Sequence, residues 1–147
     1  MLALESTTFK VPFVRGKERP RFARGRVYTP RVTQKAEEEI GLAYKAAGGT
    51  LAPKGVPVTV SITVHKAPAK STPKRVLMKL DLRKPDLDNV IKLVLDGLNG
   101  VAYEDDSQVV SIDADRVWSI PGEEDATLIT VSTPARTNTD WILTHAK

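Results

Sequence analysis

The sequence contains two pairs of acidic residues, about one helix length apart, that could together bind a divalent cation. Asp86 and Asp88 form the first pair, and Asp105 and Asp106 form the second. If the two pairs meet in the fold, several ionised carboxylates repel one another, and a bound cation relieves that repulsion. Hard oxygen ligands with open coordination positions suit Mg²⁺ or Mn²⁺. Such a site can activate a water molecule and stabilise charge on a phosphodiester during cleavage.

Lys92 lies four residues after Asp88, so the two side chains share one face of a helix. An ammonium group beside a metal centre can bind the scissile phosphate or stabilise the charge that develops on it. Ordinary structural roles also account for these residue types. Asp is a common helix cap, Asp and Lys at this spacing form common surface ion pairs, and Glu104-Asp105-Asp106 is a common turn sequence. The pattern by itself leaves both interpretations open.

The composition limits the kinds of catalytic and metal sites that the chain can form. The 147-residue chain has no cysteine, which excludes disulfides, thiol nucleophiles and thiolate metal sites. Its two histidines, His65 and His145, are too few for a multi-histidine zinc centre, so any metal must be held by oxygen. No stretch approaches the roughly 18 apolar residues of a membrane span, and the first residues lack the apolar run of a secretory signal. We therefore expect a cytoplasmic protein.

Positive charge is concentrated in residues 14–31, which we call the basic arm. The arm contains seven Lys or Arg residues and a single acid, Glu18, so its net charge is +6, whereas the whole chain carries +4. A cluster of this kind is typical of a surface that binds a polyanion, although a solvated flexible arm accounts for it equally well. The cations that we expect to contact such a polyanion lie in the arm and in a second basic stretch before the second helix: Lys17, Arg19, Arg21, Arg24, Arg26, Lys70, Lys74, Arg75, Arg83 and Lys84.

Hydrophobic periodicity predicts the elements that must position these residues. Strands are expected over residues 6–13, 57–65, 108–118 and 126–132, and helices over 33–47 and from Asp86 or Asp88 to Leu98. This order predicts a single α+β (mixed α/β) domain over residues 1–147, with one small sheet and two main helices. The tail, residues 133–147, is expected to be flexible or to form an interface.

Three local features refine this prediction. Thr33 is expected to cap the first helix. Pro12 lacks a backbone donor and favours an edge position for the first strand. The apolar residues of the second helix recur at helical spacing and predict its buried face, formed by Leu87, Ile91, Val94, Leu95 and Leu98.

Residues 84–109, KPDLDNVIKLVLDGLNGVAYEDDSQV, resemble the core signature of RusA-type Holliday junction resolvases, which are small, dimeric, Mg²⁺-dependent DNA endonucleases. The resemblance rests on the Asp-x-Asp-Asn-x-x-Lys run and the later Asp-Asp-x-Gln, and residues 17–22, KERPRF, are similar to a basic motif of some members. It implies that Asp86, Asp88 and Asp106 hold the metal and that Lys92 is the catalytic lysine. Asp105 becomes a further candidate ligand. It also implies a homodimer, and an origin in a phage or prophage.

The residues and the resemblance together predict a Mg²⁺-dependent endonuclease that cuts Holliday junctions symmetrically. A two-fold dimer would present one site to each of the two symmetry-related strands of a four-way junction. A nuclease for flaps or forks and a non-catalytic DNA-binding protein are the alternatives. Acids that face a polyanion argue against a pure binder. The prediction requires that Asp106 lie near Asp86 and Asp88, either in one subunit or across a dimer.

Overall fold

The structure, a computed structural model, describes residues 4–73, 75, 82–118 and 120–134. The elements follow one another as β1 (Leu4–Val11), β2 (Arg21–Ala23), β3 (Arg26–Tyr28), α1 (Arg31–Ala46), β4 (Val58–His65), α2 (Leu87–Leu98), the 3₁₀ turn η1 (Asp106–Gln108), β5 (Val109–Arg116) and β6 (Ala126–Pro134). No helix within these described ranges is long and apolar enough to cross a membrane.

Four of the strands form one mixed sheet in the order β1-β6-β4-β5. β6 pairs antiparallel with both β1 and β4, whereas β4 and β5 are parallel. Parallel strands need a crossover connection, and α2 lies within that connection. The expected α+β fold with one small sheet and two main helices is confirmed. β1 lies at the edge of the sheet, as Pro12 predicts.

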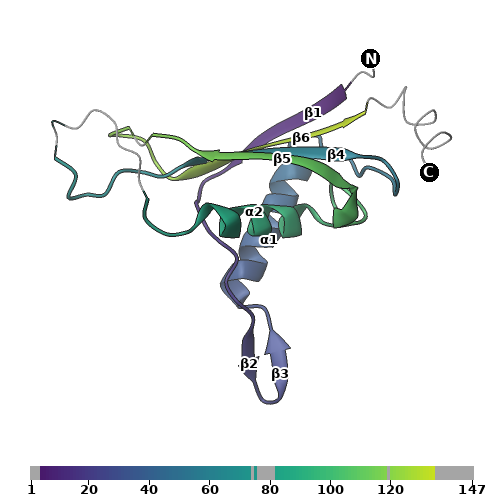
Figure 1. Cartoon of the computed structure of the whole chain (residues 1–147), viewed down its shortest axis with the longest axis horizontal. Helices are drawn as coiled ribbons and strands as arrows, with labels where there is room; N and C mark the ends of the chain where they lie inside the picture. Colours follow the sequence, from purple (N-terminus) through teal and green to yellow (C-terminus); the bar gives the residue numbers. More distant parts are fainter. Residues whose placement is uncertain (1–3, 74, 76–81, 119, 135–147) are drawn as a thin grey trace.

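The two faces of the sheet differ because polar and apolar residues alternate along its strands. The buried side chains of β4 are Val58, Val60, Ile62 and Val64, and both helices lie against this face (Figure 1). The opposite face carries polar cross-strand pairs. The hydroxyl groups of Ser6 and Ser132 are 2.8 Å apart, and those of Thr8 and Thr130 are 2.9 Å apart. The hydrophobic core therefore lies between the sheet and the helices.

Helix α1 begins at Arg31, two residues before the expected start, and Thr33 is not its cap. Pro30 occupies the cap position and supplies no side-chain hydrogen bond. Thr33 is buried inside the first turn, where its hydroxyl accepts a hydrogen bond of 3.4 Å from the backbone of Glu18. The prediction that Thr33 caps the start of the helix was wrong, because its hydroxyl contacts the backbone of the basic arm instead.

Helices α1 and α2 cross at close range because glycines lie at the contact. A Cβ atom at Gly97 of α2 would lie 2.9 Å from Ile40 Cβ and 3.0 Å from the carbonyl oxygen of Glu37. The most deeply buried apolar residues of α2 are Val90, Leu93, Val94 and Leu98. Leu87, Ile91 and Leu95 of the expected face are only partly buried. The buried face of α2 is therefore rotated relative to the predicted face, because α2 packs against both α1 and the sheet.

Candidate active site and nucleic-acid interface

Asp86 and Asp88 lie at the start of α2 and are exposed to solvent. Asp86 occupies the N-cap position, but its side chain makes no capping hydrogen bond. It accepts hydrogen bonds from Lys84 Nζ at 2.8 and 3.0 Å instead. Asp88 and Lys92 do not form an ion pair, although both lie in the part of the chain that the structure describes. Helix capping and an intrahelical ion pair therefore do not explain these residues.

A pocket of about 390 Å³ brings the start of α2 together with the beginning of the basic arm. Three of the four residues predicted to be catalytic line this one pocket. The lining residues are Lys17, Glu18, Arg19, Pro20, Asp86, Asp88, Asn89 and Lys92. The pocket thus combines oxygen ligands for a hard cation with positive groups that can bind a phosphate.

The basic arm is fixed to the rim of this pocket through its first residues. The Lys17 amide donates a hydrogen bond of 2.9 Å to the carbonyl oxygen of Asn89. Gly16 permits this approach, because a Cβ atom there would lie 2.9 Å from both Asn89 Cβ and Pro85 Cβ. The sequence did not reveal this packing role of Gly16, because it depends on a contact between segments about 70 positions apart.

Lys17 holds the two helices and the arm together. Its ammonium group forms an ion pair with Asp96 of α2 and lies 3.8 Å from Glu37 Oε1 of α1. The hydrogen bond to Asp96 raises the pKa of Lys17, and burial raises the pKa of Glu37. The structure therefore gives Lys17 partners on both helices, outside the arm itself.

The second acidic pair lies on a rigid turn after α2. The Asp105 side chain accepts a hydrogen bond from the Ser107 amide, which contributes to a capping box with Gln108 around η1. The Asp105 carboxylate raises the pKa of Asp106 through a shared hydrogen bond and direct repulsion. The backbone hydrogen bond from Ser107 lowers the pKa of Asp105. Two adjacent exposed carboxylates that repel each other are suitable oxygen ligands for a cation.

Gln108 is the buried residue that holds this acidic turn in place. Its Oε1 atom accepts hydrogen bonds from the amides of Glu104 and Asp105 at 2.9 and 3.0 Å. Its Nε2 atom donates to the carbonyl oxygens of Pro53 and Val56 at 2.8 and 2.9 Å. The Gln of the Asp-Asp-x-Gln motif therefore ties the acidic turn to the loop before β4.

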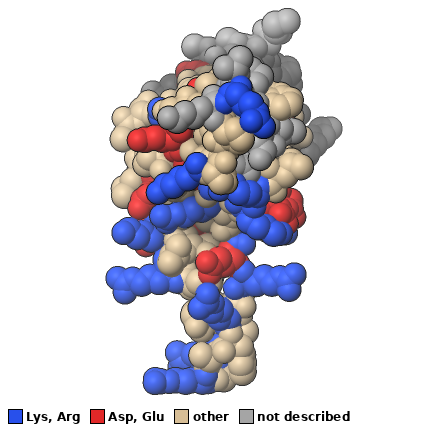
Figure 2. Space-filling model, turned by 90° about the vertical axis from the view of Figure 1, so that its left-hand side faces the viewer, with Lys and Arg blue, Asp and Glu red and all other residues tan. Residues whose placement is uncertain are grey.

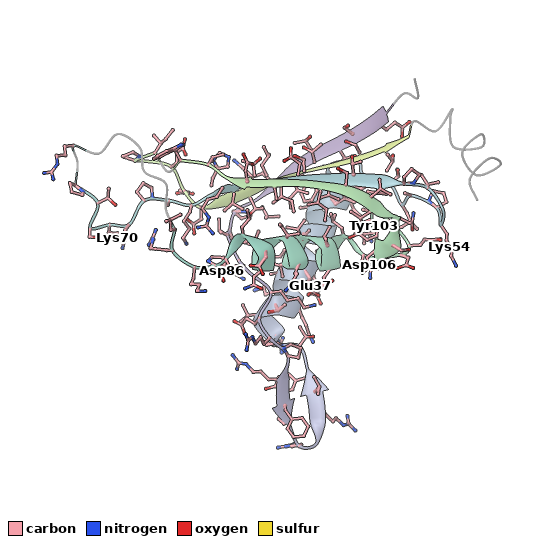
Figure 3. The ribbon with its side chains drawn as sticks, viewed as in Figure 1. Glu37, Lys54, Lys70, Asp86, Tyr103 and Asp106 are labelled. Carbon is pink, nitrogen blue, oxygen red and sulfur yellow. The ribbon has the colours of Figure 1, made fainter. Side chains whose placement is uncertain are left out.

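The expected convergence of the two acidic pairs does not occur within one protomer. Asp86 lies at the N-terminal end of α2, whereas Asp106 lies beside its C-terminal end (Figure 3). At about 1.5 Å per residue, a helix of 12 residues separates them by roughly 18 Å. Among the described residues, no cluster of three or more His, Asp or Glu side chains could hold a metal ion. The helix and the Gln108 anchor keep the pairs apart.

The basic arm continues into a hairpin that projects beyond the helices, on the side opposite the sheet (Figure 1). Figure 2 shows Lys and Arg side chains along this hairpin and over the adjoining body. Arg19, Arg21, Arg24 and Arg26 are exposed, and Arg21 lies 3.4 Å from Glu18. Their exposure leaves these cations accessible to an anionic partner.

The second basic stretch borders the start of α2. Lys70 and Arg75 are exposed, and Lys74 lies outside the described residues. Arg83 donates a hydrogen bond of 2.8 Å to the carbonyl oxygen of Ala67, so this loop is braced close to its base. Lys84 is paired with Asp86. Its ammonium group thus lies beside Asp86, which lines the pocket at the start of α2.

A pocket that combines carboxylates with a lysine, next to a projecting basic hairpin, is the arrangement expected of an enzyme that cleaves nucleic acid. The sequence model of the family described as Endodeoxyribonuclease RusA matches residues 12–131, so the chain belongs to this family. The protein is therefore an endodeoxyribonuclease, a hydrolase of DNA phosphodiester bonds, and the family implies action on Holliday junctions. No curated protein sequence matches the chain. The matched residues include the arm, the pocket and the acidic turn.

Proposed function

We propose that the protein resolves Holliday junctions by Mg²⁺-dependent, symmetric hydrolysis of two phosphodiester bonds. The observation that carries this proposal is the pocket that joins Asp86, Asp88 and Lys92 to the root of the basic arm. The Asp86 side chain does not cap the helix, and its ion-pair partner Lys84 is itself an exposed side chain, so both carboxylates remain accessible to a cation. Family membership supplies the reaction class, and the pocket supplies a place for it.

The residues of the pocket fit a hard divalent cation. Mg²⁺ is commonly held by one or two carboxylates together with waters and substrate phosphate oxygens. Asp86 and Asp88 offer two exposed carboxylates at one helix end, which matches this requirement without a complete protein cage. Bound Mg²⁺, or Mn²⁺ in its place, would polarise the scissile phosphate and lower the pKa of a coordinated water.

The positive groups of the pocket bind and orient the scissile phosphate. Lys92 is exposed on the pocket side of α2, one turn beyond Asp88, and its ammonium can stabilise charge on the phosphate. Arg19 lines the same pocket and can hold a neighbouring phosphate. Lys17 holds the arm, and with it Arg19, against α2 through its ion pair with Asp96.

We assign Asp106, with Asp105 beside it, to the metal centre of a second subunit. If α2 helices of two subunits lie antiparallel across a two-fold axis, Asp86 and Asp88 of one subunit approach the partner subunit's Asp106. Edge strand β5 runs beside α2 and carries exposed apolar side chains, Val110 at 66% and Ile112 at 44% exposure. Exposed edges of this kind readily pair with another chain. The homodimer we propose therefore forms along β5 and α2.

Such a dimer accounts for symmetric cleavage. A two-fold axis produces two equivalent sites, and a four-way junction presents two equivalent strands. The hairpin arginines and the loop around Lys70, Arg75 and Arg83 bind the phosphate backbone without reading base sequence. Selection of junctions over flaps and forks then depends on the spacing of the two sites.

The test is cleavage of a synthetic four-way junction by wild type and Asp88→Asn, with and without Mg²⁺. We expect symmetric nicks by the wild type that a chelator abolishes. Asp88→Asn should cleave at least about 10³-fold more slowly while binding the junction with nearly unchanged affinity, because only metal binding is lost. Collapse of junction binding in this variant, or cleavage that resists chelation, would contradict the proposal. Equal cleavage of flaps and forks would assign the protein to a broader branched-DNA nuclease class.

A further inference from the structure

The hairpin formed by β2 and β3 has one apolar face and one polar face. Phe22 pairs with Val27, while Arg21 pairs with Tyr28 and Ala23 pairs with Arg26. Paired residues of an antiparallel hairpin point to the same side, and successive residues point to opposite sides. Phe22 and Val27 therefore share one face, and the two arginines lie on the other.

The apolar face is uncovered in the described part of the chain. Phe22 is 73% exposed and Val27 is 71% exposed, whereas the other two phenylalanines, Phe9 and Phe13, are buried. Arg24 and Gly25, both with positive φ, form the tip of the hairpin, which is separated from this pair by Ala23 and Arg26. A hairpin with an exposed aromatic ring on one face and arginines on the other fits a partner that offers flat apolar surfaces beside negative charges. Unstacked DNA bases and their phosphates have both properties.

The hairpin begins at the rim of the pocket that contains Asp86 and Asp88. This connection fixes the position of the hairpin relative to the proposed site of the scissile phosphate. Pro20 lines the pocket, and Phe22 follows two residues later. Two residues of extended chain span about 7 Å. A DNA strand rises about 3.4 Å per nucleotide, so the chain from Pro20 at the pocket rim to Phe22 spans roughly the rise of two nucleotides. Gly16 and Lys17 fix the arm to α2, which makes this spacing a property of the fold.

We propose that Phe22, supported by Val27, inserts between the bases at the branch point of the DNA substrate. This inference rests on the proposed action on branched DNA and assigns a selectivity-determining residue to it. In a continuous duplex, insertion of an apolar side chain requires base pairs to be unstacked at a cost in free energy. At a branch point the stack is already interrupted, so the same insertion costs less. The Phe22 wedge therefore favours junctions over linear duplex.

The test measures binding in the presence of a chelator, so that it does not depend on cleavage. Phe22→Ala should weaken junction binding roughly 5- to 100-fold, the range expected for the loss of one aromatic–base stack. Its affinity for linear duplex should stay within about twofold of wild type, because the arginines are unchanged. Wild type should alter the fluorescence of 2-aminopurine at the branch point, and Phe22→Ala should not. Phe22→Trp should restore both binding and the fluorescence change.

Leu42→Ala is the matched control, because Leu42 is 65% exposed on α1 and lies outside the arm. It should bind junction and duplex as wild type does. Unchanged junction affinity in Phe22→Ala, or an equal loss for junction and duplex, would overturn the wedge. Conversion of Phe22→Ala from dimer to monomer in sedimentation would also overturn it, since the apolar face would then be a subunit contact. Wild-type cleavage, assayed separately, reports on the proposed function itself.

Discussion

Asp86 and Asp106 lie at opposite ends of α2, on the same side of the sheet but separated by the length of the helix (Figure 3). A 12-residue helix between them excludes a shared cation within one protomer, because metal–oxygen distances are about 2 Å. Two antiparallel copies of α2 would remove this separation. The relationship between these two residues therefore makes the subunit arrangement testable by mutation.

Mixing two inactive variants should restore activity if the metal centre forms between subunits. Asp88→Asn and Asp106→Asn should each be inactive as homodimers. A heterodimer of the two contains one centre with both substitutions and one centre with neither. We expect a 1:1 mixture, refolded or co-expressed, to nick one strand of a junction at a rate within about fourfold of one wild-type site.

The control for this experiment is a mixture of Asp88→Asn with Asp86→Asn, which leaves no intact centre in any combination. Full activity of Asp106→Asn on its own would show that Asp106 is not required. Inactive homodimers that stay inactive after mixing, despite heterodimer formation confirmed by mass spectrometry, would argue for a centre within one subunit.

Neutralising Arg19 and Arg21 together should flatten the salt dependence of junction binding. Each phosphate contact that is lost lowers the slope of log K against log salt by about 0.9, so the double Gln variant should lose roughly 1.8. Lys45→Gln also removes positive charge, but at the last turn of α1, far from the hairpin. It should therefore change the slope little. Fluorescence anisotropy over a series of salt concentrations measures both slopes. An unchanged slope in the double variant would mean that these arginines do not contact phosphate.

Lys17→Met should destabilise the protein in a pH-dependent way. The hydrogen bond and charge of Asp96 raise the pKa of Lys17 above its ordinary value of 10.5 in the folded state. The stabilisation is therefore complete below about pH 10 and disappears as the pH rises through the raised pKa. We expect a loss of about 1 kcal/mol at pH 7, measured by urea unfolding, because the pair is only partly buried. The difference from wild type should shrink above pH 10.5.

Replacing Lys45 with Met gives the matched control, because Lys45 is exposed on the outer part of α1. Its stability difference from wild type should be small at every pH. A Lys17→Met difference that stays constant to high pH would mean that packing of the side chain, and not its charge, stabilises the fold.

Gln108→Leu should lower both stability and cleavage while leaving junction binding intact. The substitution leaves the amides of Glu104 and Asp105 and several carbonyl oxygens without their buried partner. We expect a loss of about 2–3 kcal/mol in the free energy of unfolding. Ser107→Ala keeps the backbone hydrogen bond to Asp105 and should behave as wild type. Wild-type cleavage by a folded Gln108→Leu variant would show that the position of the acidic turn is not critical.

The four strands of the main sheet and the two helices could be predicted from the sequence because their signals are local, whereas the short hairpin of β2 and β3 was not predicted. Alternation along β4 and the edge preference of Pro12 depend only on neighbouring residues. The start of α1 could not be predicted from Thr33, because the backbone of Glu18, a distant partner, takes its hydroxyl. The buried face of α2 was predicted only in part, since α1 and the sheet cover it from two directions.

The candidate site, too, could be predicted only in part from the sequence. The spacing of Asp86, Asp88 and Lys92 placed all three residues at the start of one helix, because positions along a helix are fixed by its geometry. The pattern by itself left open whether these residues have a structural or a chemical role. The root of the basic arm reaches this helix through Gly16 and Lys17. That contact joins segments far apart in the chain, so only the folded structure could reveal it.

The sequence by itself determined which residues carry charge, which could bind a cation, and which elements hold them. Only the tertiary structure decided that Asp106 lies a full helix away from Asp86, and that the arm borders the pocket. The physical reason is that local spacing fixes positions within one helix or strand, whereas the distance between elements depends on how they pack. Here the close glycine crossing of α1 and α2 and the Gln108 anchor set those distances.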